Sequence, residues 1–308
     1  MKTTIFTSRF RAFQVTAAAA LAVFTASPAM AVTTPLADQP ILVAKVPANV
    51  MLALSVEFPT ATTRAHQGAF DGTSAVPYLG YFDPRKCYKY IGGADGYFQP
   101  IGATGTNYTC SGAWSGHFLN WATMQGADIF RWMLTGGNRS VDTPKAFGDG
   151  SADQTILERG YASPQGVNAN TFPDKIITGN DLLNYTNPSD YGAGSVAINS
   201  WSFLYIRNGG MGTQFALKYG GIDSVCTDCT KMYVRVEVCR DADGTGALLE
   251  GNCQKYANKS GTKSVYKPVG LIQEYKDKMY FGAFGYLLLN DNNNYDADGV
   301  ANIYKDGG

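Results

Sequence analysis

Six cysteines are the residues of this 308-residue sequence whose type and number indicate the clearest chemistry: Cys87, Cys110, Cys226, Cys229, Cys239 and Cys253. An even number of cysteines is typical of disulfide bonds in a protein that reaches an oxidising compartment. Sequence alone leaves the pairing open. We favour Cys87–Cys110 and Cys239–Cys253, each of which closes a loop, with Cys226–Cys229 as the remaining pair. Each longer closure would stabilise the fold by about 2–4 kcal/mol.

Two other chemistries are open to the last four cysteines. Cys226 and Cys229 have the spacing of a zinc-ligand pair. Cys239 and Cys253 are too far apart in sequence to supply a second short pair, which disfavours a tetrathiolate zinc site. A redox role for Cys226 would need a helix to begin at that residue, whereas residues 231–239 alternate like a strand. We therefore expect disulfides.

An oxygen-ligand pattern near the end of the sequence indicates a candidate calcium site. Asn294, Asp296 and Asp298 stand at alternate positions before Gly299, which matches the start of a calcium loop. The acid expected at the twelfth position is replaced by Lys305. Asn, Asp and Gly are also ordinary turn residues, so a solvated turn without any bound cation is the alternative.

Motifs of known catalytic machinery are absent from the sequence. His117 begins a long apolar stretch, where a capping or packing role is expected, and His66 lies in a polar segment that we expect at the surface. We find no nucleophile elbow, phosphate-binding loop or zinc-protease motif. A glycosidase pair could form in space from the scattered carboxylates, but no spacing singles one out. We therefore expect a protein that is not an enzyme and holds no cofactor, apart from the candidate calcium.

The main element that must position these residues is a predicted helix over residues 115–137. Ser115 is its expected N-cap and Gly136 its expected stop, and Asp128 and Arg131 are spaced to form a local pair. A helix that is apolar on nearly all sides is buried on all sides. We therefore expect a sheet on one side and further chain on the other, with large apolar side chains inside, among them Trp121, Phe130 and Trp132.

Four other stretches have the pattern of strands. The run at 49–58 is apolar without alternation, which is typical of a strand buried on both faces of a parallel sheet. Residues 200–208 and 231–239 alternate between apolar and polar, and 279–289 is a further apolar strand. Together with the helix, this order predicts an α/β fold.

Large loop-rich segments separate these elements. Residues 59–110 read as a long, partly irregular excursion that contains Cys87 and Cys110. Short helices are predicted at 151–160, 178–185 and 269–278. Several tyrosines crowd the excursion, and they either contact a protein or sugar partner or simply cover the buried helix; they are Tyr78, Tyr81, Tyr88, Tyr90 and Tyr97.

Residues 1–31 have the form of a signal peptide. A basic start precedes an apolar run at 15–24 and the small-residue motif Ala29-Met30-Ala31. The apolar run is shorter than the roughly 20 residues that span a bilayer. We predict export and cleavage after Ala31, with an uncleaved anchor as the alternative, followed by a polar lead segment over 32–48. No later stretch has the length and apolarity of a membrane span.

The charge balance argues against nucleic acid as a partner. Removal of residues 1–31 leaves 22 basic residues against 25 acidic ones, because the signal contains three basic and no acidic residues. Without a basic excess, few counterions would be released on binding a phosphate backbone. Charged residues make up 16% of the chain, and such a weakly charged composition suits an extracellular surface.

Several blocks, in order, resemble the N-terminal region of the PilC/PilY family of type IV pilus assembly and tip-associated adhesin proteins. The most specific are YFDPRKCYKY at 81–90 and SGHFLNWATM at 115–124. The resemblance implies an exported protein of a Gram-negative bacterium, located in the periplasm, at the outer membrane surface or at the pilus tip. Its expected partners are pilin or minor pilin subunits, or a host or abiotic surface.

The same resemblance implies a von Willebrand factor A-like α/β domain with disulfide-pinned insertions over residues 49–308. Family members continue into a C-terminal β-propeller-like region, so we expect this chain to be an N-terminal fragment. The family's usual metal motif after the first strand is replaced here by Ser55, Val56 and Glu57. These residues lack the several oxygen ligands that a hard divalent cation needs, so we expect no metal there. A secreted carbohydrate-binding or hydrolytic protein and a calcium-dependent extracellular module are the alternative functions.

Overall fold

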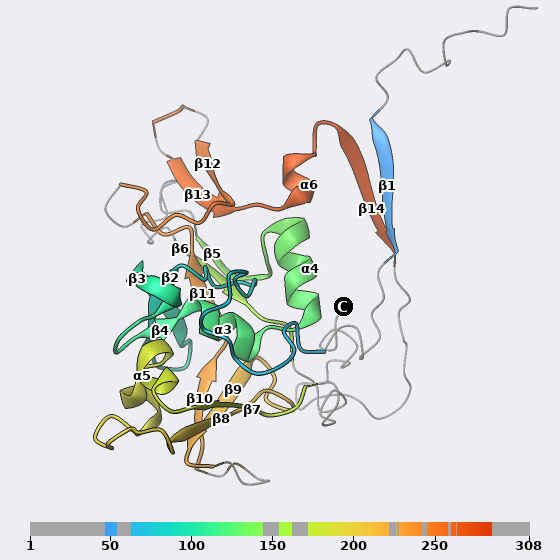
Figure 1. The fold of residues 1–308 in the computed structure, drawn as a ribbon. Coiled ribbons are helices and arrows are strands. Elements are labelled where there is room, and N and C mark those ends of the chain that lie inside the picture. Colours follow the sequence, from blue (N-terminus) through green and yellow to red (C-terminus); the bar gives the residue numbers. More distant parts are fainter. Residues whose placement is uncertain are drawn as a thin grey trace, which may run out of the picture. The chain divides into compact units, whose positions relative to one another are not determined.

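The computed structural model describes residues 47–53, 63–143, 154–161, 172–221, 226, 228–241, 245–257, 260–262 and 264–284. The chain divides into two compact units, Met1–Val46 and Pro47–Gly308, and every described residue belongs to the second. The predicted signal peptide over 1–31 therefore lies outside the described residues. The second unit is a mixed α/β structure whose described strands form four sheets (Figure 1).

The largest sheet has six strands in the order β4-β2-β3-β11-β6-β5. Their bounds are Trp114–Ser115, Lys86–Ile91, Tyr97–Ala103, Arg235–Val238, Gln154–Glu158 and Arg139–Thr143, in that order. The pairing of β3 with β11 is parallel, and the other pairings are antiparallel. The partly irregular excursion predicted at 59–110 contains, among its described residues, the irregular segment 63–85 and the β2–β3 hairpin. The helix predicted at 151–160 is wrong: its described residues form strand β6, whose β-branched Thr155 and Ile156 suit a buried strand.

The second sheet is antiparallel and has the order β10-β9-β8-β7. Its strands are β7 (Lys175–Thr178), β8 (Phe203–Arg207), β9 (Gln214–Tyr219) and β10 (Thr230–Tyr233). The strand predicted at 200–208 is confirmed as β8. The single strand predicted at 231–239 is two strands, because the chain leaves this sheet at Val234 and enters the six-stranded sheet as β11. Alternating burial continues through Val234, which is 1% exposed, so the sequence pattern does not reveal the change of sheet.

The helix predicted over 115–137 is broken into α3 (Gly116–Thr123) and α4 (Gly126–Thr135). Met124 and Gln125 between them are extended, with ψ angles of 141° and 161°, and Gln125 forms an antiparallel bridge with Arg64. Both predicted ends are confirmed. The Ser115 side chain accepts a hydrogen bond from the Phe118 amide, and Gly136 adopts the left-handed conformation with φ 84°.

Burial differs between the two helices. Every residue of α3 is buried, and Trp121 is 1% exposed. In α4, Phe130 is 54% exposed and Met133 is 42% exposed, and Trp132 is half-buried. The expectation of burial on all sides therefore holds for α3 and is wrong for α4. The apolar content of α4 concealed an outward face, because an exposed Phe reads in sequence like a buried one.

Two short helices and one hairpin complete the body. Helix α5 (Asp181–Tyr185) confirms the prediction at 178–185, and α6 (Leu271–Glu274) lies within the helix predicted at 269–278. Single 3₁₀ turns occur at η1 (Thr106–Tyr108) and η4 (Pro188–Tyr191). Strands β12 (Cys253–Ala257) and β13 (Ser264–Pro268) form an antiparallel hairpin. None of the described helices has the length and apolarity of a membrane span.

Strands β1 (Ala48–Ala53) and β14 (Met279–Phe284) form a separate parallel ribbon, in register from Ala48 opposite Met279 to Ala53 opposite Phe284. They confirm strands within 49–58 and 279–289. The burial on both faces predicted for 49–58 is wrong for the described residues, since Met51 is 65% exposed. In β14, Tyr280 and Phe284 are each more than 60% exposed. The described strands therefore do not show a von Willebrand factor A-like sheet, because the ribbon has only two strands among the described residues.

One apolar core joins α3 to the inner faces of both larger sheets. Phe98 of β3, Phe215 of β9 and Phe118 of α3 are each fully buried within it. Aromatic rings meet there in several geometries: Phe98 contacts Trp114 edge to face at 6.0 Å between centroids, whereas Trp114 and Phe118 are stacked at 6.1 Å. Helix α3 is therefore held from both sides and provides a fixed platform for the chain that crosses it.

Candidate recognition groove

Helix α3 presents three polar groups on one face, at the spacing i, i+3 and i+4 that brings helical residues together. These are His117, Asn120 and Trp121, which are 0%, 0% and 1% exposed. Their polar atoms bind the backbone of residues 63–85, which we call the strap. The strap runs from Thr63 to the start of β2 and has no helix or longer strand of its own.

Asn120 makes the most bonds to the strap. Its side-chain nitrogen donates to the carbonyl oxygens of Tyr78 at 2.8 Å and Phe82 at 2.7 Å. Its side-chain oxygen accepts a hydrogen bond from the Phe82 amide at 3.1 Å. One buried side chain thus satisfies three backbone groups that would otherwise be left without partners away from water.

His117 binds the strap through both ring nitrogens. The Tyr78 amide donates to Nδ1 at 3.1 Å, so Nε2 carries the proton and donates to the Asp71 carbonyl at 3.1 Å. The ring is stacked between those of Tyr78 and Tyr108, at 4.5 and 4.2 Å between centroids. Burial lowers the pKa of His117 below its ordinary value, against the opposing influence of Asp71. The predicted packing role of His117 is therefore confirmed.

Further bonds tie the start of the strap to its end. Trp121 Nε1 donates to the Gly68 carbonyl at 3.2 Å, and His66 Nε2 donates to the Leu79 carbonyl at 2.7 Å. His66, expected at the surface, is half-buried. The Lys175 ammonium group from β7 donates to the His66 carbonyl at 3.1 Å. Burial, assisted by the nearby charge of Arg64, lowers the pKa of Lys175 to about 7.

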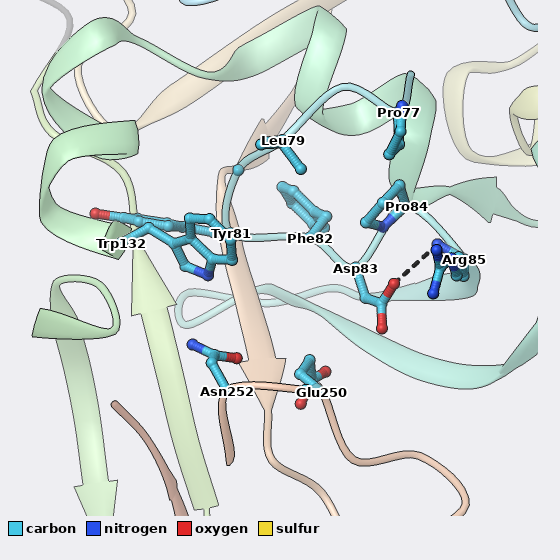
Figure 2. A pocket seen from close by; sticks show the side chains of 12 residues that line it. Pro77, Leu79, Tyr81, Phe82, Asp83, Pro84, Arg85, Trp132, Glu250 and Asn252 are labelled. Atoms are coloured by element: carbon cyan, nitrogen blue, oxygen red, sulfur yellow. Dashed lines mark hydrogen bonds between the residues drawn. The ribbon is translucent and has the colours of Figure 1, made fainter. Parts of the chain in front are cut away.

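The outer side of the strap forms one wall of a groove of about 390 Å³. The other walls come from Trp132 of α4 and from residues 250–252, and Figure 2 shows Trp132 and Arg85 at opposite ends. The strap contributes a mainly apolar wall made of Pro77, Leu79, Gly80, Tyr81, Phe82, Asp83, Pro84 and Arg85. Leu79 is the most available apolar side chain, at 43% exposed.

The floor of the groove is fixed by buried aromatic residues. Tyr81 and Phe82 are 2% and 1% exposed, and the Tyr81 hydroxyl oxygen accepts a hydrogen bond from the Asn138 amide at 3.2 Å. Gly80 allows the strap to lie this close to α3, because a Cβ there would stand 2.3 Å from the Asn120 side-chain oxygen. The groove is therefore preformed.

The wall at residues 250–252 is anchored by an ion pair and a disulfide. The Lys86 ammonium lies 2.6 Å from a Glu250 carboxylate oxygen, and the other oxygen accepts from the Cys239 amide at 2.6 Å. Cys239 is bonded to Cys253. Cys239, Glu250 and Cys253 bring three potential metal ligands together, but disulfide-bonded sulfurs offer no thiolate, so this cluster is a structural joint.

The structure pairs the six cysteines as we favoured: Cys87–Cys110, Cys226–Cys229 and Cys239–Cys253. Their Cα atoms are 5.2 to 5.6 Å apart, within the usual range for a disulfide. The zinc alternative is therefore wrong, since none of the cysteines is free. Thr230 and strand β10 follow Cys229 directly, so no helix begins at this motif, as the redox alternative would need.

The candidate calcium ligands Asn294, Asp296 and Asp298 lie outside the described residues, as do Ser55, Val56 and Glu57.

Asp128, which we predicted to pair locally with Arg131, is influenced by the charge of Arg131 and also binds two backbone amides. Asp128 is fully buried and accepts from the amides of Gly160 at 2.7 Å and Gln125 at 3.2 Å. Burial raises its pKa, although these bonds and the charges of Arg159 and Arg131 lower it.

The crowded tyrosines mostly cover the core. Tyr88 is 0% exposed, and its hydroxyl oxygen accepts from the Asp83 amide at 2.9 Å. Tyr90 is half-buried, and its hydroxyl oxygen accepts from the Tyr233 amide at 3.0 Å. Sequence reasoning missed the groove because Trp132 and residues 250–252 carry no motif and lie far from the strap in sequence.

Comparisons with known proteins show what this chain is similar to in sequence, and no solved structure matches it. A family described as "PilY1 homolog, small alpha/beta domain" matches residues 69–212, which include most of the strap and all of α3 and α4. Two proteins of Xylella fastidiosa, each named "Type IV pilus biogenesis factor PilY1 homolog", are similar to the chain. One is 33% identical over 83% of this chain, and the other is 29% identical over 67%. The matched regions cover 20% and 15% of these relatives, so the chain spans about a fifth or less of their length.

Proposed function

Because this chain belongs to the PilY1 family, we propose that it acts in type IV pilus biogenesis by binding another macromolecule rather than by catalysis. The observation that carries the proposal is the similarity to a type IV pilus biogenesis factor over 83% of the chain. The groove supports binding as the mode of action. It is preformed and mainly apolar, and it has Asp83, Arg85, Glu250 and Asn252 at its margins.

An apolar groove with a polar margin suits a peptide segment of a protein partner, because apolar side chains supply the affinity and the margin supplies orientation. We propose pilin or minor pilin subunits as that partner. Leu79 and Trp132 would contact it directly, since Leu79 is exposed and Trp132 lies at one end of the groove (Figure 2).

Deletion of the gene and complementation with variants tests this proposal in cells. We expect the deletion to lose surface pili and twitching motility, and Leu79→Asp or Trp132→Ala to restore them poorly. Leu183→Asp is a matched control, because Leu183 is 44% exposed on α5 and is not part of the groove. Full piliation and motility in the deletion strain, with no second copy of the gene, would overturn the proposal.

Binding can also be measured directly. The purified chain and soluble domains of the pilins encoded by the same organism would be mixed in a titration followed by calorimetry. We expect one of them to bind wild type and the Leu183→Asp control equally, and to bind Leu79→Asp at least tenfold more weakly, which corresponds to about 1.4 kcal/mol. Equal binding by all three would remove the groove from the proposal.

We further propose that β1 and β14 begin a von Willebrand factor A-like sheet. Parallel strands need a crossover connection, and the whole body between Ala53 and Met279 provides it here. Parallel sheets are normally covered on both faces, which suits the uncharged, apolar sequences of both strands. A solved structure of the longest natural form of the protein tests this; a ribbon that stays two-stranded there would contradict it.

We propose export as the route to the pilus, on the basis of residues 1–31. Fractionation of the cells and N-terminal sequencing of the exported protein test it, with Val32 expected as the first residue. A protein that keeps Met1 and stays in the cytoplasm would contradict the proposal.

We also propose that Asn294, Asp296 and Asp298 bind calcium. Calorimetric titration with calcium tests this, first on wild type and then on a chain with both Asp296→Ala and Asp298→Ala. The absence of heat from wild type would contradict the proposal.

A second function, carbohydrate binding, is favoured by one feature outside the groove. Phe203 and Tyr205 alternate along β8 with the buried Leu204 and Ile206, so they face outward. Trp201, two residues before Phe203, is 86% exposed. Phe203 and Tyr205 are half-buried, so Trp201 is the ring most available to stack on a sugar ring. A glycan array with wild type and Trp201→Ala tests this. If both proteins bind the same glycans equally well, Trp201 is excluded as part of the site.

A further inference from the structure

The histidine that holds the strap can do so in one protonation state. His117 Nδ1 must carry no proton, because it accepts the Tyr78 amide hydrogen at 3.1 Å. A second proton on the ring would set two donors against each other and break this bond. The ring is 0% exposed, so water cannot replace the lost partner without movement of the strap.

The groups around His117 do not favour the charged form enough to remove this constraint. The strap contributes Asp71, Tyr78 and His66, the segment at η1 contributes Tyr108, and α5 contributes Tyr185 beyond Phe70. Asp71 is the one carboxylate that raises the pKa of His117, and burial outweighs it. Lys175 adds positive charge near His66, and Arg64 adds positive charge near Lys175.

Loss of the Tyr78 bond would reach the groove directly. Tyr78 lies between Pro77 and Leu79, which both line the groove. The Leu79 carbonyl also holds His66, so the two arms of the strap move together. Asn120 would continue to hold Phe82, which confines the movement to the part of the strap before residue 80. Within that part, the bond of Asn120 to the Tyr78 carbonyl and the bond of Trp121 to the Gly68 carbonyl would have to break together with that of His117.

We propose that His117 is an acid-sensitive latch: its neutral ring holds the strap on α3, and its protonation releases residues 66–79 and deforms the groove. This inference rests on the proposed function only in naming the groove as the affected site. The latch would make binding by the groove depend on the acidity of the compartment around the protein.

Hydrogen exchange on the purified, fully oxidised chain tests the latch without any ligand. Exchange of residues 66–79 would be followed by mass spectrometry between pH 7.5 and 5, corrected for intrinsic rates, with residues 203–219 as the internal control. We expect the opening constant of the strap segment to rise by up to about tenfold per pH unit once His117 begins to take up its proton. A flat profile, or an equal rise in residues 203–219, would overturn the latch.

Two variants assign the effect to one ring. His117→Asn keeps an acceptor near the position of Nδ1 but does not titrate, so its profile should be flat. His66→Asn removes the other histidine of the chain and should keep the wild-type rise. If His117→Asn does not fold, NMR titration of the wild-type histidine rings replaces it. The His117 titration midpoint must then coincide with that of strap opening, and a mismatch would overturn the proposal. Failure of every pilin to bind at any pH would remove the proposed function and leave this result standing.

Discussion

Replacement of Asn120 by alanine gives the sharpest test of how the strap is held. The change leaves three buried backbone groups without partners: the carbonyls of Tyr78 and Phe82 and the amide of Phe82. Each such group costs about 1–3 kcal/mol when left unsatisfied. Entry of water into the vacated space would recover part of this, so we expect Asn120→Ala to lower the free energy of unfolding by about 3–5 kcal/mol.

Urea denaturation of the disulfide-bonded protein measures this change. The corresponding fall in Tm is about 2–4 °C for each kcal/mol in a domain of this size. Asn49→Ala is the control, because Asn49 is exposed on β1 and surface changes usually stay within about 0.5 kcal/mol. A loss below about 1 kcal/mol in Asn120→Ala would refute the view that these bonds hold the strap.

A second substitution at the same position separates lost bonds from lost volume. Asn120→Asp keeps the acceptor for the Phe82 amide but turns a carboxylate oxygen toward the two carbonyls. At neutral pH it should destabilise at least as much as alanine, although it leaves no cavity. The deficit relative to wild type should shrink in acid, where the protonated carboxyl can donate to one carbonyl. A deficit that does not change with pH would argue against this geometry.

Three further predictions concern stability. Removal of the Cys239–Cys253 disulfide, which closes a loop with a sequence separation of 14, should lower the free energy of unfolding by about 3 kcal/mol. Removal of Cys226–Cys229, with a separation of 3, should lower it by about 2 kcal/mol. Equal urea midpoints for the two serine-substituted forms would contradict this. Burial lowers the pKa of Lys175 from 10.5 to about 7, so between these values the unfolded chain binds more protons, and the free energy of unfolding should rise with pH by up to about 1.4 kcal/mol per unit. Urea titrations at pH 7.5 and 9 should show this rise in wild type and not in Lys175→Met, and the same rise in both would exclude Lys175 as its source. Gly80→Ala would place a Cβ 2.5 Å from the Met124 side chain and should lower the free energy of unfolding by about 1–3 kcal/mol. Gly92→Ala is the control, because no atom lies within 4 Å of the added Cβ, and it should be nearly neutral. Similar losses of stability in both variants would show that the strap can move to make room for the added methyl group.

Local patterns were sufficient to predict part of this fold. The ends of the α3–α4 region at Ser115 and Gly136 and the strand β8 follow from short-range rules of capping and alternation. The three disulfides match the pairing that loop closure favoured, although the sequence left other pairings open. The break at Met124 and Gln125 does not follow from such rules, because it depends on a bridge from Gln125 to Arg64, which is distant in sequence. Neither of those two positions holds a glycine or a proline, the residue types that would predict a break in the helix.

The groove was beyond prediction for a related reason. His117 and Asn120 are polar residues within an apolar stretch, and their partners are backbone atoms of the strap about 40 residues earlier in the chain. Backbone groups have no sequence signature, so such bonds cannot be read from residue types. The same holds for Lys86 and Glu250, an ordinary pair of charges until the fold brings them to 2.6 Å.

The parallel ribbon determines how the protein would respond to a pulling force. The chain enters β1 at Ala48 and leaves β14 at Phe284, and these residues stand at opposite ends of the ribbon because Ala48 is opposite Met279. Tension applied to the two flanking segments would therefore load the strands in shear, so that the ladder of hydrogen bonds resists together instead of opening one bond at a time. Until the ribbon yields, the body that connects Ala53 to Met279 carries none of that load.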